Sequence, residues 1–77
     1  MVVGYILVTT ETDMEREVYR NLAKMKKIQE VHLLFGEYDL IAKTEARDFD
    51  SLGRFVLKKI RSIDGVMDTE TLTGVKF

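Results

Sequence analysis

The centre of the chain reads VHLLFGEYDLIA over residues 31–42, in which two apolar runs flank the turn-forming residues Gly36-Glu37-Tyr38-Asp39. The flanking runs are rich in β-branched and aromatic residues, which favour strands. A glycine between them lets the backbone adopt the positive φ that tight turns require. The stretch therefore predicts a β-hairpin, with one strand over residues 31–35 and the next over residues 38–45.

A helix is predicted on the N-terminal side of this hairpin. Thr12-Asp13-Met14-Glu15 has the form of a capping box, with the threonine as N-cap and the glutamate three residues later. Apolar residues then recur every three or four positions, as on one face of a helix, at Met14, Val18, Leu22 and Met25. Before this helix, residues 2–8 are apolar except for Gly4 and predict a buried strand.

A second helix and a last strand are predicted on the C-terminal side. Asp48 is the expected N-cap, and Asp64-Gly65 is the expected helix stop. Between them the helical spacing is kept by Phe49, Leu52, Val56, Ile60 and Ile63. Gly53 in this helix costs up to about 1 kcal/mol relative to alanine, so we expect it to pack closely against a strand or another subunit. Residues 66–75 alternate loosely and predict the final strand.

The predicted order of strand, helix, strand, strand, helix, strand divides into two similar halves. Laying one half on the other places Met14 on Phe49 and Val31 on Val66. Two right-handed split βαβ units make a ferredoxin-like α+β fold, a four-stranded antiparallel sheet with both helices on one face. The 77 residues suffice for one such domain, over residues 1–77.

The strand alternation leaves the second face of the sheet apolar as well. Tyr5 and Leu7 point away from Ile6 and Val8, so both faces carry apolar side chains. A chain of this length without cysteine has few other means of stabilisation. We therefore expect a second copy to cover the open face and form a symmetric dimer.

Composition argues against several classes of protein. The net charge of −1 argues against nucleic-acid binding. Two basic clusters near the helix ends are expected at opposite edges of the fold, where they offset the helix dipoles: Lys24, Lys26 and Lys27, and Lys58, Lys59 and Arg61. No apolar run approaches the roughly 18 residues of a membrane span, and the N-terminus lacks the charged region of a signal peptide. A cytoplasmic protein is expected, and the abundance of charged residues with few Asn and Gln suggests a thermophilic source.

No catalytic residue, cofactor or metal centre is predicted. His32 is the single histidine and stands near Glu30 in a predicted strand, with no nucleophile or metal ligand at an evident spacing. The chain has no cysteine, and its carboxylates lack the spacing of a calcium loop.

The hairpin tip and the last strand are the remaining candidates for a binding site. A free amino acid needs donors for its carboxylate and an acceptor for its ammonium group. Backbone N–H groups near Gly36, the hydroxyls of Thr69 and Thr71 and the carboxylate of Asp39 can supply both. The alternative is a structural turn beside a solvated threonine face.

Taken together, these segments resemble the effector-binding C-terminal domain of the leucine-responsive regulatory protein/AsnC family of transcription regulators, also called the RAM domain. The resemblance covers almost the whole chain, and its specific part is the Gly-x-Tyr-Asp motif that begins at Gly36. It implies a non-enzymatic amino-acid-sensing and oligomerisation module, which binds its effector between dimers that close into a ring such as an octamer. It further implies a pocket lined by Gly36, Tyr38 and Asp39 from the hairpin and approached by Thr69 and Thr71 from the last strand.

The chain departs from full-length members of that family in one respect. They carry a helix-turn-helix domain before this module, whereas this chain begins a few residues before its first strand. We therefore expect a stand-alone version that does not bind DNA by itself, and that acts alone or joins full-length regulators. Two alternatives stay open: a small dimeric α+β barrel enzyme with His32 pointing into a cavity between sheet and helices, and an ACT-like regulatory domain.

Overall fold

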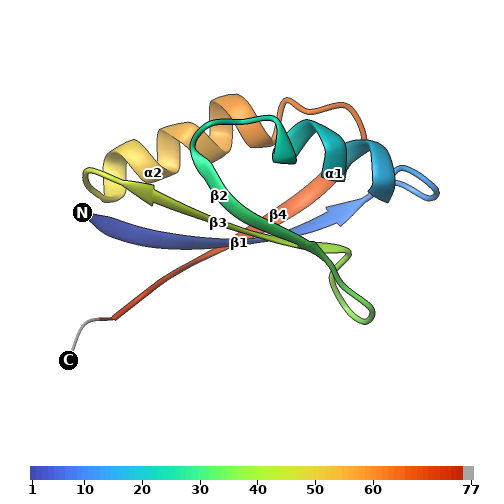
Figure 1. Ribbon diagram of the computed structural model, residues 1–77, viewed down its shortest axis with the longest axis horizontal. Helices are drawn as coiled ribbons and strands as arrows, with labels where there is room; N and C mark the ends of the chain where they lie inside the picture. The colour runs from blue at the N-terminus through green and yellow to red at the C-terminus, as the bar shows by residue number, and fades with distance from the viewer. Residues whose placement is uncertain (76–77) are drawn as a thin grey trace.

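The computed structural model describes residues 1–75 and has the predicted βαββαβ order (Figure 1). Lys76 and Phe77, which the predicted domain includes, lie outside the described residues. The elements are β1 (Val2–Thr10), α1 (Glu15–Ala23), β2 (Ile28–Leu33), β3 (Leu40–Ala46), α2 (Phe49–Phe55), its π-helical continuation η1 (Val56–Ile60), and β4 (Val66–Thr73).

The four strands form one antiparallel sheet in the order β2-β3-β1-β4. Both helices lie on the same face of this sheet (Figure 1). Directly paired residues of antiparallel strands point to the same face, and Ile6 of β1 pairs with Ala42 of β3 and Thr71 of β4. This arrangement confirms the predicted ferredoxin-like fold.

The core lies between the sheet and the helices. Ile6 and Val8 of β1 point to that side and are fully buried, as the strand alternation predicts. They pack with apolar residues of α1, β3, α2 and η1, namely Val18, Leu22, Leu40, Leu52, Phe55, Val56 and Ile60. The core therefore joins both helices to the two central strands.

The start of α1 differs from the prediction. Thr12 is not the N-cap, because the helix begins at Glu15 behind Met14, which makes no side-chain cap hydrogen bond. The Glu11 N–H instead donates to the Gly65 carbonyl at 2.8 Å, which extends the β1 edge, and the Met14 N–H donates to the Glu11 carbonyl at 3.0 Å. This turn places Asp13 at φ +67°, outside the helical region. The capping-box prediction was therefore wrong.

The start of α2 agrees with the prediction. Asp48 is the N-cap, and its Oδ1 accepts a hydrogen bond from the Ser51 N–H at 2.8 Å. Farther along, the π-helical turn brings both Phe55 and Val56 against the sheet. Phe49 belongs to the predicted apolar face, yet its exposed fraction is 64%.

The close helix–sheet contact occurs at Gly4 and not at Gly53. A Cβ atom added to Gly4 would lie 2.7 Å from Leu52 Cδ1, whereas one added to Gly53 would meet nothing within 4 Å. The prediction that Gly53 packs closely against a strand was therefore wrong, and close packing against another subunit stays a prediction. The glycine that the packing requires is on β1, opposite α2.

The open face of the sheet has an apolar centre. Tyr5 pairs with Leu72 and Leu7 pairs with Ile41, so all four side chains lie on the face without helices. This agrees with the predicted second apolar face.

The two basic clusters meet in part, contrary to the prediction that they lie at opposite edges, although Arg61 lies 3.9 Å from Asp68 in the edge strand β4. Lys27, between α1 and β2, lies 5.4 Å from the centroid of the Phe55 ring in α2. One hollow is lined by Met25, Lys26, Lys27, Phe55 and Lys59. The long side chains reach across because the end of α1 lies beside α2.

A candidate ligand site at the hairpin tip

The tip between β2 and β3 is a short loop that projects beyond the sheet (Figure 1, green). Gly36 has φ +149° and open space around it, and the Leu34 N–H donates to the Asp39 carbonyl at 2.8 Å. The strands end at Leu33 and begin again at Leu40. The loop is therefore longer than predicted, and Tyr38 lies in it and not in a strand.

Hydrogen bonds of Asp39 join the tip to the end of β1. Its Oδ2 accepts hydrogen bonds from the Thr10 N–H at 2.8 Å and from the Thr10 hydroxyl at 3.2 Å. Its own N–H donates to the Val8 carbonyl at 2.9 Å. Among the residues that the structure describes, these bonds use Oδ2 alone, so Oδ1 can still accept a hydrogen bond from a ligand.

A hydrogen bond of Tyr38 joins the tip to β4. Its hydroxyl donates to Glu70 Oε1 at 2.8 Å. This hydrogen bond, together with partial desolvation and the negative charges of nearby carboxylates, raises the pKa of Tyr38 above its usual 10.0. The phenol is therefore held in place as a neutral donor.

The predicted threonines lie on the other side of β4. Thr69 pairs with Val8 and Thr71 with Ile6, so both point toward the helix side, whereas Glu70 points toward the open face. The structure thus brings Gly36, Tyr38 and Asp39 together on one loop, but joins neither Thr69 nor Thr71 to them within one chain.

A cleft of about 500 Å³ opens beside the tip. Asp39 lines it from the tip, Thr10 lines it from the end of β1, and Arg16 lines it from the first turn of α1. Apolar walls come from Leu33, Leu34 and Phe35, and further carboxylates from Glu11, Asp13 and Glu15. A cleft of this kind offers a carboxylate and a guanidinium to a zwitterion.

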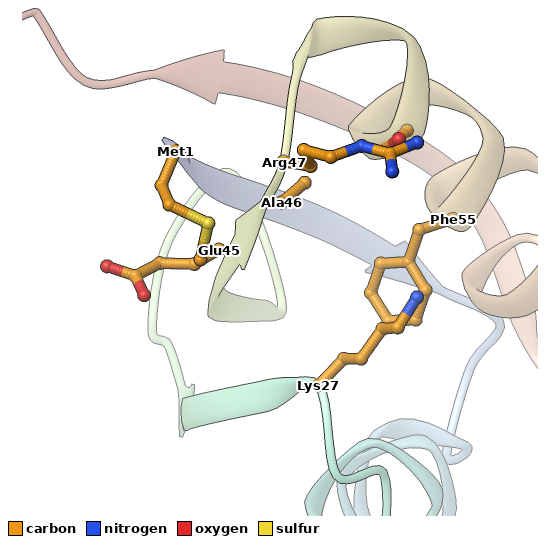
Figure 2. A pocket seen from close by; sticks show the side chains of 7 residues that line it. Met1, Lys27, Glu45, Ala46, Arg47 and Phe55 are labelled. Atoms are coloured by element: carbon orange, nitrogen blue, oxygen red, sulfur yellow. The ribbon is translucent and has the colours of Figure 1, made fainter.

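A second hollow, of about 380 Å³, lies at the opposite end of the sheet. Figure 2 shows Lys27 extended over the Phe55 ring, with Arg47 nearby at the end of β3. It shares no residue with the cleft at the tip.

The histidine lies away from both hollows. The side chain of His32 is 63% exposed and contacts Glu30 at 3.2 Å. It pairs with Ile41 on the open face of the sheet, and not in a cavity between sheet and helices. The condition that an α+β barrel enzyme would require is therefore not met.

The described residues contain neither a metal site nor a membrane-spanning helix. Among residues 1–75, no group of three His, Cys, Asp or Glu side chains is placed to hold a metal ion. No helix in that same part of the chain is long and apolar enough to cross a membrane.

Comparison with known proteins identifies the family. The model of the Lrp/AsnC ligand binding domain matches residues 3–76. The chain belongs to the Lrp/AsnC family. An uncharacterised HTH-type transcriptional regulator of Pyrococcus horikoshii is 38% identical to this Lrp/AsnC domain over 74 residues, which are 92% of the chain and 49% of the regulator. The chain thus spans about half the length of the curated relatives it matches.

Solved structures share the fold of this Lrp/AsnC domain. FFRP-DM1 is 36% identical, with a TM-score of 0.91, and the match covers 97% of this chain and 100% of that one. A Neisseria meningitidis transcriptional regulator, solved as a complex with L-Met, superposes with a TM-score of 0.87 at 23% identity. That match covers 97% of this chain and 50% of the regulator, and at this identity it shows the fold alone.

Sequence reasoning missed the partners of the tip in this Lrp/AsnC domain. The sequence did not predict that the tip meets Thr10, Glu70 and Arg16, although these residues stand close in the sequence to segments that were predicted correctly. The signal available was strand register, since Thr10 follows the predicted end of the first strand and Glu70 lies between the two predicted threonines.

Proposed function

We propose that this chain is a non-enzymatic amino-acid-sensing and oligomerisation module of transcription regulation. The observation that carries the proposal is the cleft beside the hairpin tip, in which Asp39 and Arg16 line the same hollow. The carboxylate suits the ammonium group of a free amino acid, and the guanidinium suits its carboxylate. The match to the Lrp/AsnC ligand binding domain supports the same role.

The proposed site extends beyond one subunit. Asp39 lines the cleft from the tip, whereas Gly36 and Tyr38 stand on the same loop outside the cleft lining, so we propose that these two residues contact the effector where a second subunit completes the site. Thr69 and Thr71 line no part of this cleft, so we propose that they reach the effector from another subunit. The effector then lies between dimers of a ring, with an octamer as the proposed assembly.

The proposed mechanism is linkage between binding and assembly. A ligand that contacts two dimers binds the assembled state more tightly than the separate dimers, and therefore shifts the population toward the ring. The neighbour from Neisseria was solved with L-Met, which supports a small amino acid as the ligand. We further propose that this domain acts on transcription through its assembly, alone or together with full-length regulators.

Calorimetry with each of the common amino acids tests this proposal, with light scattering on the same samples to follow assembly. We expect at least one amino acid to bind and to increase the mean molar mass. Binding of none, with no change in mass, would remove the sensing role and leave only a scaffold.

Asp39→Asn is the sharpest variant for the site. The amide oxygen keeps an acceptor for the Thr10 N–H, so folding is retained, while the negative charge that the ammonium group requires is lost. We expect amino-acid affinity to fall by about tenfold or more, since hydrogen bonds to charged groups contribute about 1.5–3 kcal/mol. Glu17→Gln removes one charge outside the cleft and is the matched control. Equal affinity in the Asp39 variant and the control would exclude Asp39 from the site.

A further inference from the structure

The two ends of the molecule carry opposite charge. The hairpin end is the cleft at the tip, where the acidic side chains of Glu11, Asp13, Glu15 and Asp39 outnumber the single basic one, Arg16, beside exposed Phe35. The basic groove is the set of adjoining hollows at the other end, which share Lys27 and Phe55. Its rim is completed by Arg47, Arg54, Lys58 and Lys59, and Glu45 is the one carboxylate among the residues that line these three hollows.

The charges of the basic groove are largely uncompensated within one chain. Among residues 1–75, four ion pairs form, and only one of them involves the groove, between Arg47 and Asp48 at 3.7 Å. Lys27, Arg54 and Lys59 pair with no carboxylate in that part of the chain. The groove therefore presents a positive rim to a partner.

The groove also has an apolar floor. Phe55 is buried, with the Lys27 ammonium over its ring, and Met25 lies beside it in the same hollow. A floor of this kind favours a partner with an apolar group as well as negative charge.

The hairpin end has that combination. Phe35 is fully exposed, and its neighbours Leu33 and Leu34 are also exposed. An aromatic side chain buries about 150–250 Å² when it is covered by a partner, so exposed Phe35 is a strong anchor. The carboxylates of Glu11 and Glu15 line the cleft with it.

We propose that the hairpin end of one copy docks in the basic groove of a second copy. Phe35 rests on the floor formed by Phe55 and Met25, while the carboxylates of the first copy face the lysines of the second. This contact is heterologous, so repetition generates a ring if the rotation closes. The inference rests on the oligomerisation part of the proposed function, and it identifies the two surfaces that meet between dimers.

A second copy accounts for the groove better than nucleic acid does. A phosphate backbone would use the positive rim but leave the apolar floor and Phe35 uncovered. A chain of net charge −1 supplies both the groove and its complement.

A charge-swap experiment tests the contact with the full chain. Lys27→Glu with Lys59→Glu reverses the groove, and Glu11→Lys with Glu15→Lys reverses the hairpin end. We expect each double variant alone to lose the larger assembly in sedimentation analysis, with an association constant at least about tenfold weaker, and an equimolar mixture to recover it. Arg20→Glu with Lys24→Glu makes the same change in net charge outside the groove and should retain the assembly.

The apolar part of the contact is tested separately. Phe35→Ser should weaken the larger assembly, while Leu57→Ser, at an exposed position outside the hairpin end and the basic groove, should leave it intact. Circular dichroism confirms folding of every variant. The proposal is overturned if Phe35→Ser assembles normally, if the mixed variants do not combine, or if the wild type forms nothing larger than a dimer. Binding of duplex DNA at physiological salt that the groove variant abolishes would likewise overturn it and assign the groove to nucleic acid. Because a bound amino acid is proposed to favour the ring, every variant is compared at the same amino-acid concentration, and calorimetry measures amino-acid binding separately.

Discussion

Gly4 decides how closely α2 approaches the sheet, and its substitution gives a residue-scale prediction. Gly4→Ala places a methyl group 2.7 Å from Leu52 Cδ1, so Leu52 must shift within the core. We expect a loss of about 1–3 kcal/mol in the free energy of unfolding, as for other overpacked cores. Gly53→Ala is the matched control, because its added methyl group meets nothing and the helix gains about 0.5–1 kcal/mol. Urea denaturation of both variants measures the difference, and a Gly4→Ala protein as stable as wild type would contradict the packing argument.

At the same scale, the sequence predicted the tip but not its partners. The Gly-x-Tyr-Asp motif indicated that Tyr38 and Asp39 are more than turn residues. Their hydrogen bonds to Glu70 and Thr10 join residues 32 and 29 positions apart. Such contacts depend on strand register, which local patterns do not specify.

Among the secondary-structure elements, α2 gives a prediction about pH. The hydrogen bonds from Ser51 lower the pKa of Asp48 below its usual 3.8. A lowered pKa in the folded state adds stability above the pKa of the unfolded chain, and this contribution is lost as pH falls through the folded value. We expect wild type to lose stability more steeply than Asp48→Asn below pH 3.8, because asparagine caps a helix without titrating. Urea denaturation from neutral to acidic pH measures the two slopes, and parallel slopes would exclude Asp48 as a contributor.

Helix starts also show where sequence patterns are insufficient. Asp48 and Thr12 both stand before a helical pattern, yet only Asp48 is a cap. The difference comes from the preceding strand, because the Glu11 N–H remains bonded to Gly65 and the chain needs a turn before α1 can begin. Element order follows from apolar periodicity, whereas element ends depend on such tertiary hydrogen bonds.

The molecule as a whole has an apolar surface on the open face of the sheet and charged surfaces at its two ends. Its open face is apolar at the centre, and its two ends carry opposite charge. The basic clusters were predicted to lie apart because their backbone positions were considered without the reach of lysine side chains. Charge that is dispersed in the sequence is therefore concentrated at one end in the fold.

The open face gives the prediction for the whole molecule. Leu7 lies at the centre of this face beside Ile41, and we expect a second copy to cover both. Leu7→Lys places a charge in that contact while leaving the core side of β1 unchanged, so the variant should remain folded but have a lower molar mass by light scattering than wild type, whose single chain is 8.9 kDa. Leu57→Lys, on the solvent side of the helix, should remain a dimer or larger. The wild-type melting temperature should rise with protein concentration, because association stabilises only the folded chain, and that of Leu7→Lys should rise less. A concentration-independent melting temperature in the wild type, with the mass of a monomer, would show that the open face does not pair.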